Sequence, residues 1–273
     1  MVLVREYHRP HKLEEALELL QRADAVPLAG GQHLLAEGRR EAKTLVDLQA
    51  LGLDRTVLEE GRLRIGAMVR LQQLAATPHG CTLLAEAAHR DGPITYRNAA
   101  TVGGIVATGD PLSCLLLSLL VLDAEVEVQH IGGSTKVVLD ELLDNPANRL
   151  QRGLITAVTV TPCATGTALA VVARTPRDRP TVAVVVRLTR HGEQCDQVRI
   201  AWGGVAPRPM RAHTVEQALS GRPLEAAMIE TALSPAVVAL QPLDDFRGSA
   251  EYRRAMIAVL TRRALWEAWS KAA

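Results

Sequence analysis

The spacing of hydrophobic and polar positions near the N-terminus predicts a small α/β unit. In Leu13–Ala23 the apolar residues recur at the spacing of one helical face. A short apolar run, Ala25–Ala29, follows and stops at Gly30-Gly31, and Thr44–Leu48 is a second strand candidate. A helix, a strand, a glycine turn and another strand in succession are typical of an α/β unit.

Shorter elements are predicted from there to about residue 160. They are strands at Arg62–Ala67 and Glu125–Val128 and helices at Leu71–Ala76 and Cys81–His89. A second glycine pair, Gly103-Gly104, precedes an apolar run that ends with Cys114–Leu122. That run is far too short to cross a bilayer, so the chain is not expected to span a membrane.

A different pattern begins near Thr161. Three strands in an antiparallel meander are predicted at Thr167–Ala173, Val182–Leu188 and Val198–Val205, with a turn at His191-Gly192-Glu193 between the last two. Helices are predicted at Thr214–Leu219, Leu224–Ala232 and Ala250–Ala268. Ser249 is the expected N-cap of the last helix, and Glu251 lies in its first turn, where an anion suits the dipole. The sequence thus predicts a mixed α/β part before a boundary near 161 and an α+β part after it.

Composition and charge exclude several classes of function. The chain has 273 residues, enough for two domains, and a net charge of +1 without a long basic block, which argues against nucleic acid as a partner. The N-terminus has no charged leader before an apolar run, so we expect a cytoplasmic protein without a secretory signal. The cysteines are scattered without a CxxC pair, so this chain is not expected to bind a zinc ion or an iron–sulfur cluster. His8 and His11 flank Pro10 and are interpreted as a surface turn, not as metal ligands.

The two glycine pairs are the candidate binding features. Gly30-Gly31 follows a predicted strand directly, and Thr101-Val102-Gly103-Gly104 lies at a similar junction about seventy residues later. Adjacent glycines allow positive φ and consecutive exposed N–H groups, which can hold a diphosphate without a lysine. Tight turns that only reverse the chain are the alternative, and spacing alone favours that alternative because such pairs are common in turns. Neither pair forms a GxGxxG or a Walker A motif.

Five segments in order resemble the FAD-binding subunit of molybdenum hydroxylases, the group that includes carbon monoxide dehydrogenase and bacterial xanthine dehydrogenase. They are Ala29-Gly30-Gly31-Gln32 with Leu34-Leu35, Arg64-Ile65-Gly66-Ala67-Met68, Arg97–Gly104, Gly204–Ala212 and Arg247–Arg254. The resemblance covers nearly the whole chain. It implies a two-part PCMH-type FAD-binding domain over 1–160, made of two α/β subdomains split near 57. An antiparallel three-stranded sheet with a helical bundle over 161–273 would follow it.

The resemblance also implies the role of the chain in a larger enzyme. A large partner subunit would hold the molybdenum cofactor and oxidise the substrate, and a small one would carry [2Fe–2S] clusters. The FAD of this subunit would pass electrons from those clusters to NAD, oxygen or another acceptor, and no side chain here would act as a general acid or base. The positions that match the family's FAD-binding segments are Leu28, Ala29, Gly30, Gly31, Gln32, His33, Leu34, Thr101, Gly103, Gly104, Asp110, Cys114 and Leu154.

The sequence departs from the family pattern at several positions. His33 replaces the usual Ser, Ile105 the usual Asn, and Cys114 an acid that binds the sugar-alcohol chain, although Asp110 lies nearby. Arg179 stands where the carbon monoxide dehydrogenase branch of the family often has an aromatic residue. Its side chain would either stabilise a reduced flavin or face solvent, and we favour solvent. These departures motivate an alternative, a scaffold subunit of the same kind of complex that has lost its flavin. A free-standing flavin reductase is a third, weaker hypothesis.

Overall fold

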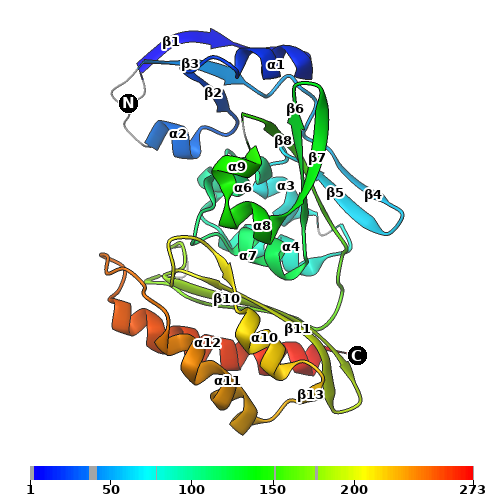
Figure 1. The fold of residues 1–273 in the computed structure, drawn as a ribbon, viewed down its shortest axis with the longest axis vertical. Helices are drawn as coiled ribbons and strands as arrows, with labels where there is room; N and C mark the ends of the chain where they lie inside the picture. The colour runs from blue at the N-terminus through cyan, green and yellow to red at the C-terminus, as the bar shows by residue number, and fades with distance from the viewer. Residues whose placement is uncertain (1–2, 37–41, 78, 151, 176–177, 273) are drawn as a thin grey trace. The chain divides into compact units, whose positions relative to one another are not determined.

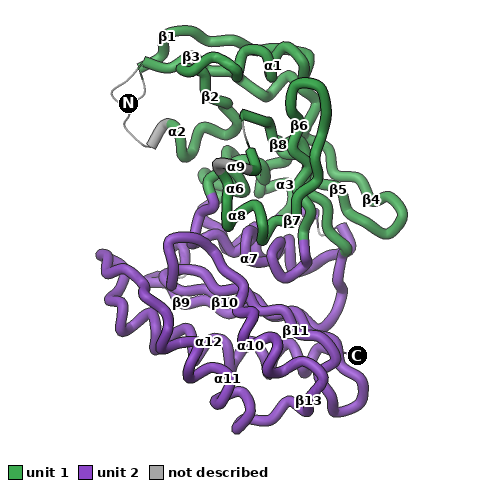
Figure 2. The backbone as a smooth tube through the Cα atoms, in the orientation of Figure 1, with its two compact units in different colours: residues 1–74, 94–108, 124–161 green, residues 75–93, 109–123, 162–273 purple. Residues whose placement is uncertain are grey.

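The computed structural model describes residues 3–36, 42–77, 79–150, 152–175 and 178–272. It forms two compact units (Figure 2), each assembled from separate stretches of chain. Unit 1 consists of Met1–Leu74, Ile94–Thr108 and Ala124–Thr161, and unit 2 of Ala75–Pro93, Gly109–Asp123 and Pro162–Ala273. The chain passes into unit 2 for the last time after Thr161, but two earlier stretches also belong to unit 2. The division into domains at 160 stays a prediction.

The first sheet of unit 1 is parallel, with strand order β1-β3-β2 (Figure 1). Its strands are β1 (Leu3–His8), β2 (Ala25–Leu28) and β3 (Ala42–Asp47), and α1 (Leu13–Leu19) connects the first two. The predicted helix and two strands are confirmed, whereas β1 was missed because its residues are mostly exposed and show no buried stripe. Ala16, Leu17, Val46 and Met68 are core members of the hydrophobic cluster on this sheet.

The second sheet of unit 1 is antiparallel, with order β4-β5-β8-β6-β7. Its strands are β4 (Thr56–Glu59), β5 (Arg62–Gly66), β6 (Glu125–His130), β7 (Gly133–Val138) and β8 (Leu154–Val160). Besides α1, the helices that lie mainly in unit 1 are α2 (Gln32–Ala36), α3 (Leu71–Ala76), α5 (Ile94–Arg97), α6 (Val102–Thr108), α8 (Leu139–Asp144) and α9 (Pro146–Leu150). Position 57, the predicted split, lies within β4. The helix α6 packs against β5 and β8, at the end of the sheet where the glycine segments lie.

The sheet of unit 2 contains the predicted meander, β9 (Thr167–Val172), β10 (Val182–His191) and β11 (Gln194–Gly203), with a turn at Gly192. The expectation of three strands was wrong, because β12 (Met210–Arg211) and β13 (Arg222–Pro223) both pair with β11 and make the sheet five-stranded. Strands of two residues carry too little alternation to be detected in a sequence. The predicted C-terminal helices are α10 (His213–Leu219), α11 (Ala226–Val238) and α12 (Ala250–Lys271), and Ser249 caps α12 by accepting the N–H of Tyr252.

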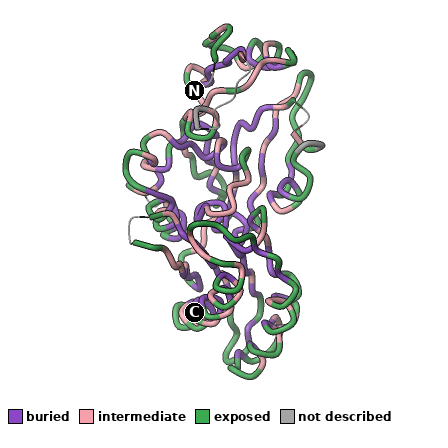
Figure 3. Tube along the Cα trace, turned by 90° about the vertical axis from the view of Figure 1, so that its left-hand side faces the viewer, coloured by how far each residue is buried: buried purple, intermediate pink, exposed green. Residues whose placement is uncertain are grey.

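Helices cover both faces of this sheet, which explains its apolar strands. α12 packs on β9 and β10, whereas α7 (Cys114–Val121) packs on β10 and β11 and also against α4 (Thr82–Arg90). Every residue of Val182–Val186 is therefore buried, and the strand shows a continuous apolar run instead of alternation. All residues of α7 are buried as well, as expected for a helix that is apolar on all sides. Figure 3 shows buried stretches in the interior of the fold and exposed stretches along its outer turns.

Two buried arginines tie the segments of unit 2 together. Arg211 forms a bidentate pair with Glu216 at 2.6 and 2.7 Å, and Glu216 also accepts the N–H of Ile200. Arg253 is buried and donates to the carbonyls of Thr181 and Gly204. Among the helices in the described part of the chain, none is long and apolar enough to span a membrane.

Candidate functional site

The first glycine pair lies in unit 1, between the end of β2 and the start of α2. The carbonyl of Leu28 accepts the N–H of Leu48 at 3.0 Å, which fixes the start of the loop to the neighbouring strand. Gly31 has a φ of 72°, the left-handed region in which L side chains are strained, so the sequence needs glycine there. Ala29 packs against the hydrophobic cluster of the first sheet. The start of the loop is therefore held in place, and the chain turns at Gly31.

Gly30 brings this loop into contact with the segment that leads into α6. A Cβ built on Gly30 would lie 1.8 Å from the carbonyl oxygen of Ala99 and 3.3 Å from the Cα of Ala100. No side chain fits in that space, so glycine permits a backbone-to-backbone approach. Ala99 and Ala100 are themselves fixed, because both donate their N–H to the carbonyl of Tyr96. The two glycine segments, distant in sequence, thus lie side by side in unit 1.

The second pair lies in a helix, so the alternative of a tight turn was wrong at this position. Gly103 and Gly104 lie in the first turn of α6. The N–H of Gly103 donates to the carbonyl of Ala67 at 2.8 Å, and that of Gly104 donates to Oγ1 of Thr101 at 3.2 Å, an N-cap interaction. Both amides predicted to face an anion are therefore already bonded within the chain. Glycine is needed at 103 for packing, since a Cβ there would lie 2.7 Å from the Cβ of Ala67.

Besides the first glycine pair, one further backbone donor is left near the second pair, the N–H of Thr101. Among the residues that the structure describes, the N–H groups of Gly30, Gly31 and Thr101 have no acceptor. Thr101 is only 3% exposed, and it follows directly after the alanines that contact Gly30. Its isolated bridge to Arg70 uses the N–H groups of the flanking residues Leu71 and Val102 and leaves its own N–H outside the pair. A buried N–H without a partner is rare in proteins, so the N–H of Thr101, together with those of the half-buried Gly30 and Gly31, marks a candidate place for an oxygen-rich ligand.

The remaining predicted site residues of unit 1 differ in their exposure. Gln32 and His33 are exposed at the start of α2, and Leu34 is half-buried. Leu154, at the start of β8, is 5% exposed and belongs to the same hydrophobic cluster that Ala29 contacts. Ile105 is buried in α6, so the position where the family has Asn packs into the core here.

Asp110, in unit 2, is held by an arginine. Its carboxylate lies 2.7 Å from the guanidinium of Arg179 and also accepts the N–H of Leu112. Nε of Arg179 donates to the carbonyl of Asp91 at 3.2 Å. The expectation that Arg179 faces solvent was therefore wrong, because its side chain joins the segment before β10 to the end of α4 and to the segment before α7. Sequence reasoning could not have found this, since the three segments meet only in the fold.

Cys114 is fully buried at the start of α7, where Asp91 caps the helix. The Asp91 carboxylate accepts the hydroxyl of Ser113 and the N–H groups of Cys114 and Leu115, and Oγ of Ser113 accepts the N–H of Leu116. All the free amides of the first turn are satisfied in this way. Burial raises the pKa of Asp91 to about 7 and the pKa of the Cys114 thiol well above its usual value. Nothing in the sequence signals a cap from a residue so distant from the helix.

The residues that the structure describes contain no cluster of three or more His, Cys, Asp or Glu side chains that could hold a metal. Cys81, Cys114 and Cys195 are buried as free thiols, and Cys163 is half-buried.

Comparisons with known proteins match both parts of the chain. A family described as "FAD binding domain in molybdopterin dehydrogenase" matches residues 3–163, and one described as "CO dehydrogenase flavoprotein C-terminal domain" matches residues 167–268. The Escherichia coli (strain K12) protein YgfM is 35% identical over 262 residues, which is 94% of each chain. The carbon monoxide dehydrogenase medium chain of Hydrogenophaga pseudoflava is 29% identical over 281 residues, 98% of each chain.

The fold is similar as well. A solved structure of carbon monoxide dehydrogenase from Hydrogenophaga pseudoflava, in a form that lacks the Mo-pyranopterin moiety, superposes with a TM-score of 0.92. The identity is 29%, and the match covers 100% of both chains. The mixed α/β architecture of this chain is therefore that of a subunit of an oxidoreductase.

Proposed function

Because this chain belongs to the family of FAD-binding domains of molybdopterin dehydrogenases, with a CO dehydrogenase flavoprotein C-terminal domain, we propose that it is an electron-transfer subunit. In this proposal its FAD passes electrons from the [2Fe–2S] clusters of a small partner subunit to a terminal acceptor. A large partner subunit holds the molybdenum cofactor and oxidises the substrate. The name "medium chain" of the carbon monoxide dehydrogenase relative supports a place in an assembly of several chains.

The observation that carries the proposal is the contact between the two glycine segments. Gly30 and Gly31 present two N–H groups without acceptors, and the N–H of Thr101 lies beyond the alanines that Gly30 contacts. A diphosphate is a string of acceptor oxygens, and backbone amides can bind it without a cationic side chain. These donors fit the diphosphate of FAD. Gly103 allows α6 to pack closely against Ala67, and Gly104 lies in the helix that Thr101 caps.

The residues around the donors would fix the rest of the cofactor. Gln32, His33 and Leu34 follow the turn at Gly31 directly, and Leu154 belongs to the hydrophobic cluster that Ala29 contacts. In this proposal they lie next to the cofactor. When bound, FAD supplies the electron-carrying chemistry, and the protein positions it and sets its surroundings. Asp110 and Cys114 stay proposed contacts. The Asp110 carboxylate is already shared with Arg179, and the Cys114 thiol is buried while its N–H donates to Asp91.

The first test is the visible spectrum of the purified full-length chain, followed by titration with FAD. A bound flavin gives a yellow protein, and a chain purified without flavin should quench FAD fluorescence with one site per chain. If neither the purified protein nor a chain titrated to about 100 μM FAD carries flavin, the proposal is wrong and the scaffold alternative replaces it.

The second test concerns the route of the electrons. The chain is assembled with its iron–sulfur and molybdenum partners, with and without FAD, and the clusters are reduced with dithionite. Reoxidation of the clusters by NAD or dioxygen should be fast only in the FAD-loaded assembly. Equal rates with and without FAD would exclude electron transfer through this chain even if FAD binds.

A further inference from the structure

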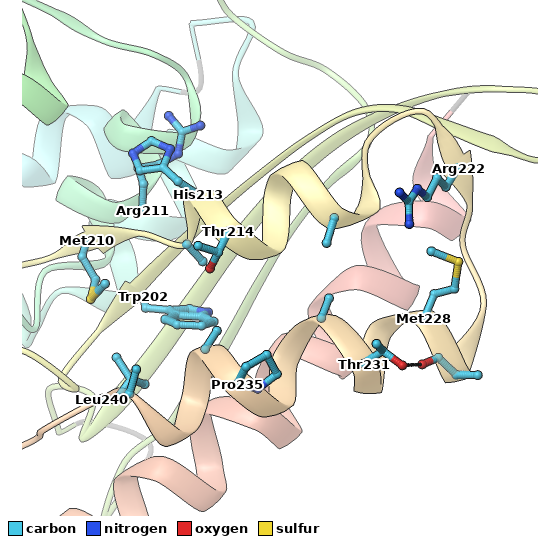
Figure 4. Close-up of a pocket in the computed structure, with 16 residues that line it drawn as sticks. Trp202, Met210, Arg211, His213, Thr214, Arg222, Met228, Thr231, Pro235 and Leu240 are labelled. Atoms are coloured by element: carbon cyan, nitrogen blue, oxygen red, sulfur yellow. Dashed lines mark hydrogen bonds between the residues drawn. The ribbon is translucent and has the colours of Figure 1, made fainter.

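An apolar groove lies between α10 and α11 in unit 2 (Figure 4). Its volume is about 820 Å³. Trp202 and Leu240 lie toward one end of the groove, together with Met210, and Met228 lies toward the other. This groove is separate from the glycine segments and has no part in the proposed FAD site.

Small residues of both helices line the groove. Ala218 comes from α10, and Ala232, Pro235 and Ala236 come from α11, so their short side chains leave the space between the helices open. Its inner wall is rigid, because Trp202 is buried in the core of unit 2 and its indole N–H donates to the hydroxyl of Thr261 at 3.0 Å. A fixed apolar trough of this volume lies in the range of small-molecule sites.

The charged residues of the groove are all basic. Its lining contains Arg211, His213 and Arg222 and no Asp or Glu. Arg211 is neutralised by Glu216, which also lies 3.4 Å from the ring of His213. Arg222 has no acidic partner among the described residues, and its backbone is fixed by the pairing of β13 with Cys195. One positive charge therefore stays available at the Met228 end of the groove.

We propose that this groove binds a small amphipathic monocarboxylate, with the carboxylate at Arg222 and the apolar body along Met228 toward Trp202 and Leu240. A negative head group matches the uncompensated charge, and a flexible apolar body matches walls in which methionines adapt to the shape of a ligand. A helix from a partner protein would also be apolar, but the volume of the groove fits a small molecule.

The experiment measures binding of dodecanoate and, for comparison, uncharged dodecanol to the full-length chain by titration calorimetry. Dodecanoate should bind with one site and about fivefold more tightly than dodecanol, the size of an exposed charge pair. Arg222→Gln should remove that difference, and it should fold normally because the side chain is exposed. Ala232→Leu, which fills the groove, should weaken both ligands at least about tenfold. Arg263→Gln, an exposed arginine on α12 outside the groove, is the matched control and should bind as the wild type does.

Several results would overturn the proposal. One is no binding of dodecanoate up to about 1 mM. Another is binding that Arg222→Gln and Ala232→Leu leave unchanged, or that Arg263→Gln weakens equally. A third is binding to the isolated chain that disappears in the complex with partner subunits, because the groove would then be a protein interface. The FAD titration is independent of all these measurements, so failure here leaves the flavin proposal untouched.

Discussion

The contact at Gly30 allows a quantitative prediction for Gly30→Ala. The added Cβ would lie 1.8 Å from the carbonyl oxygen of Ala99, so the two glycine segments must open by about 1.6 Å to reach an ordinary contact of 3.4 Å. The obstacle is main chain on both sides, which cannot rotate away as a side chain would. We therefore expect a cost at the upper end for an overpacked site, about 2–3 kcal/mol.

That cost should appear in the affinity for FAD. If FAD binds only when the two segments are in contact, binding must restore that contact in the variant. The free energy of binding then becomes less favourable by the same amount. A cost of about 2–3 kcal/mol corresponds to a rise of roughly 30- to 150-fold. Titration of each variant with FAD, followed by flavin fluorescence, measures this ratio directly. Thermal unfolding of the same samples reports the strain in the absence of FAD.

Gly133→Ala is the matched control in the same unit. A Cβ at Gly133 meets nothing within 4 Å, and the residue does not need the left-handed region. This variant should bind FAD as the wild type does and should unfold at the same temperature or slightly higher, since alanine restricts the unfolded chain. The reasoning is refuted if Gly30→Ala keeps its affinity within about threefold of the control and unfolds at the same temperature.

Three further predictions concern unit 2. Glu216→Ala should lower the free energy of unfolding by about 1–3 kcal/mol, because Arg211 and the N–H of Ile200 lose a buried acceptor and Arg211 keeps only its ion pair with Asp123. Glu230→Ala, which breaks an exposed pair, should cost less than about 1 kcal/mol in urea unfolding. Ser249→Ala should cost about 1 kcal/mol by the same assay, because α12 loses its cap. Burial raises the pKa of Asp91 to about 7 in the folded protein, so this carboxyl group ionises at lower pH in the unfolded chain. The free energy of unfolding should therefore fall as pH rises from about 4 to 7. Asp91→Asn should remove that slope, which unfolding at pH 5 and pH 8 would detect; an equal slope in both proteins would contradict the assignment.

Elements in which hydrophobic residues recur at a regular spacing were predicted from the sequence. Elements that depend on a neighbouring strand or helix in the fold were not. The helix at Leu13 and the meander of β9–β11 follow from local spacing. The run Cys114–Leu122 was visible as apolar, but only the fold shows that it is a helix covered by a sheet on one side and by α4 on another. β12 and β13 exist because β11 offers them a partner, a property that two residues cannot encode.

The site shows the same limit at the level of single atoms. The turn at Gly31 was predictable, because a strand followed by two glycines indicates a positive φ. The free N–H of Thr101 was not, since it results from the way that Leu71 and Val102 bond on either side of it. Asp91 could not be identified either, because it reaches α7 only through the packing of α4 against that helix.

The glycines of the two pairs therefore have different structural roles. These roles indicate how much the departures from the family pattern affect FAD binding. Gly31 sets a backbone angle, Gly30 and Gly103 permit close packing, and the donors belong to Gly30, Gly31 and Thr101. His33 and Ile105 change side chains and leave these main-chain donors in place. Loss of a side-chain contact typically weakens binding by about tenfold or less, whereas loss of the loop contact would remove the donors together. The departures thus predict a weaker or differently tuned FAD site, and not an absent one, as long as Gly30 stays against Ala99.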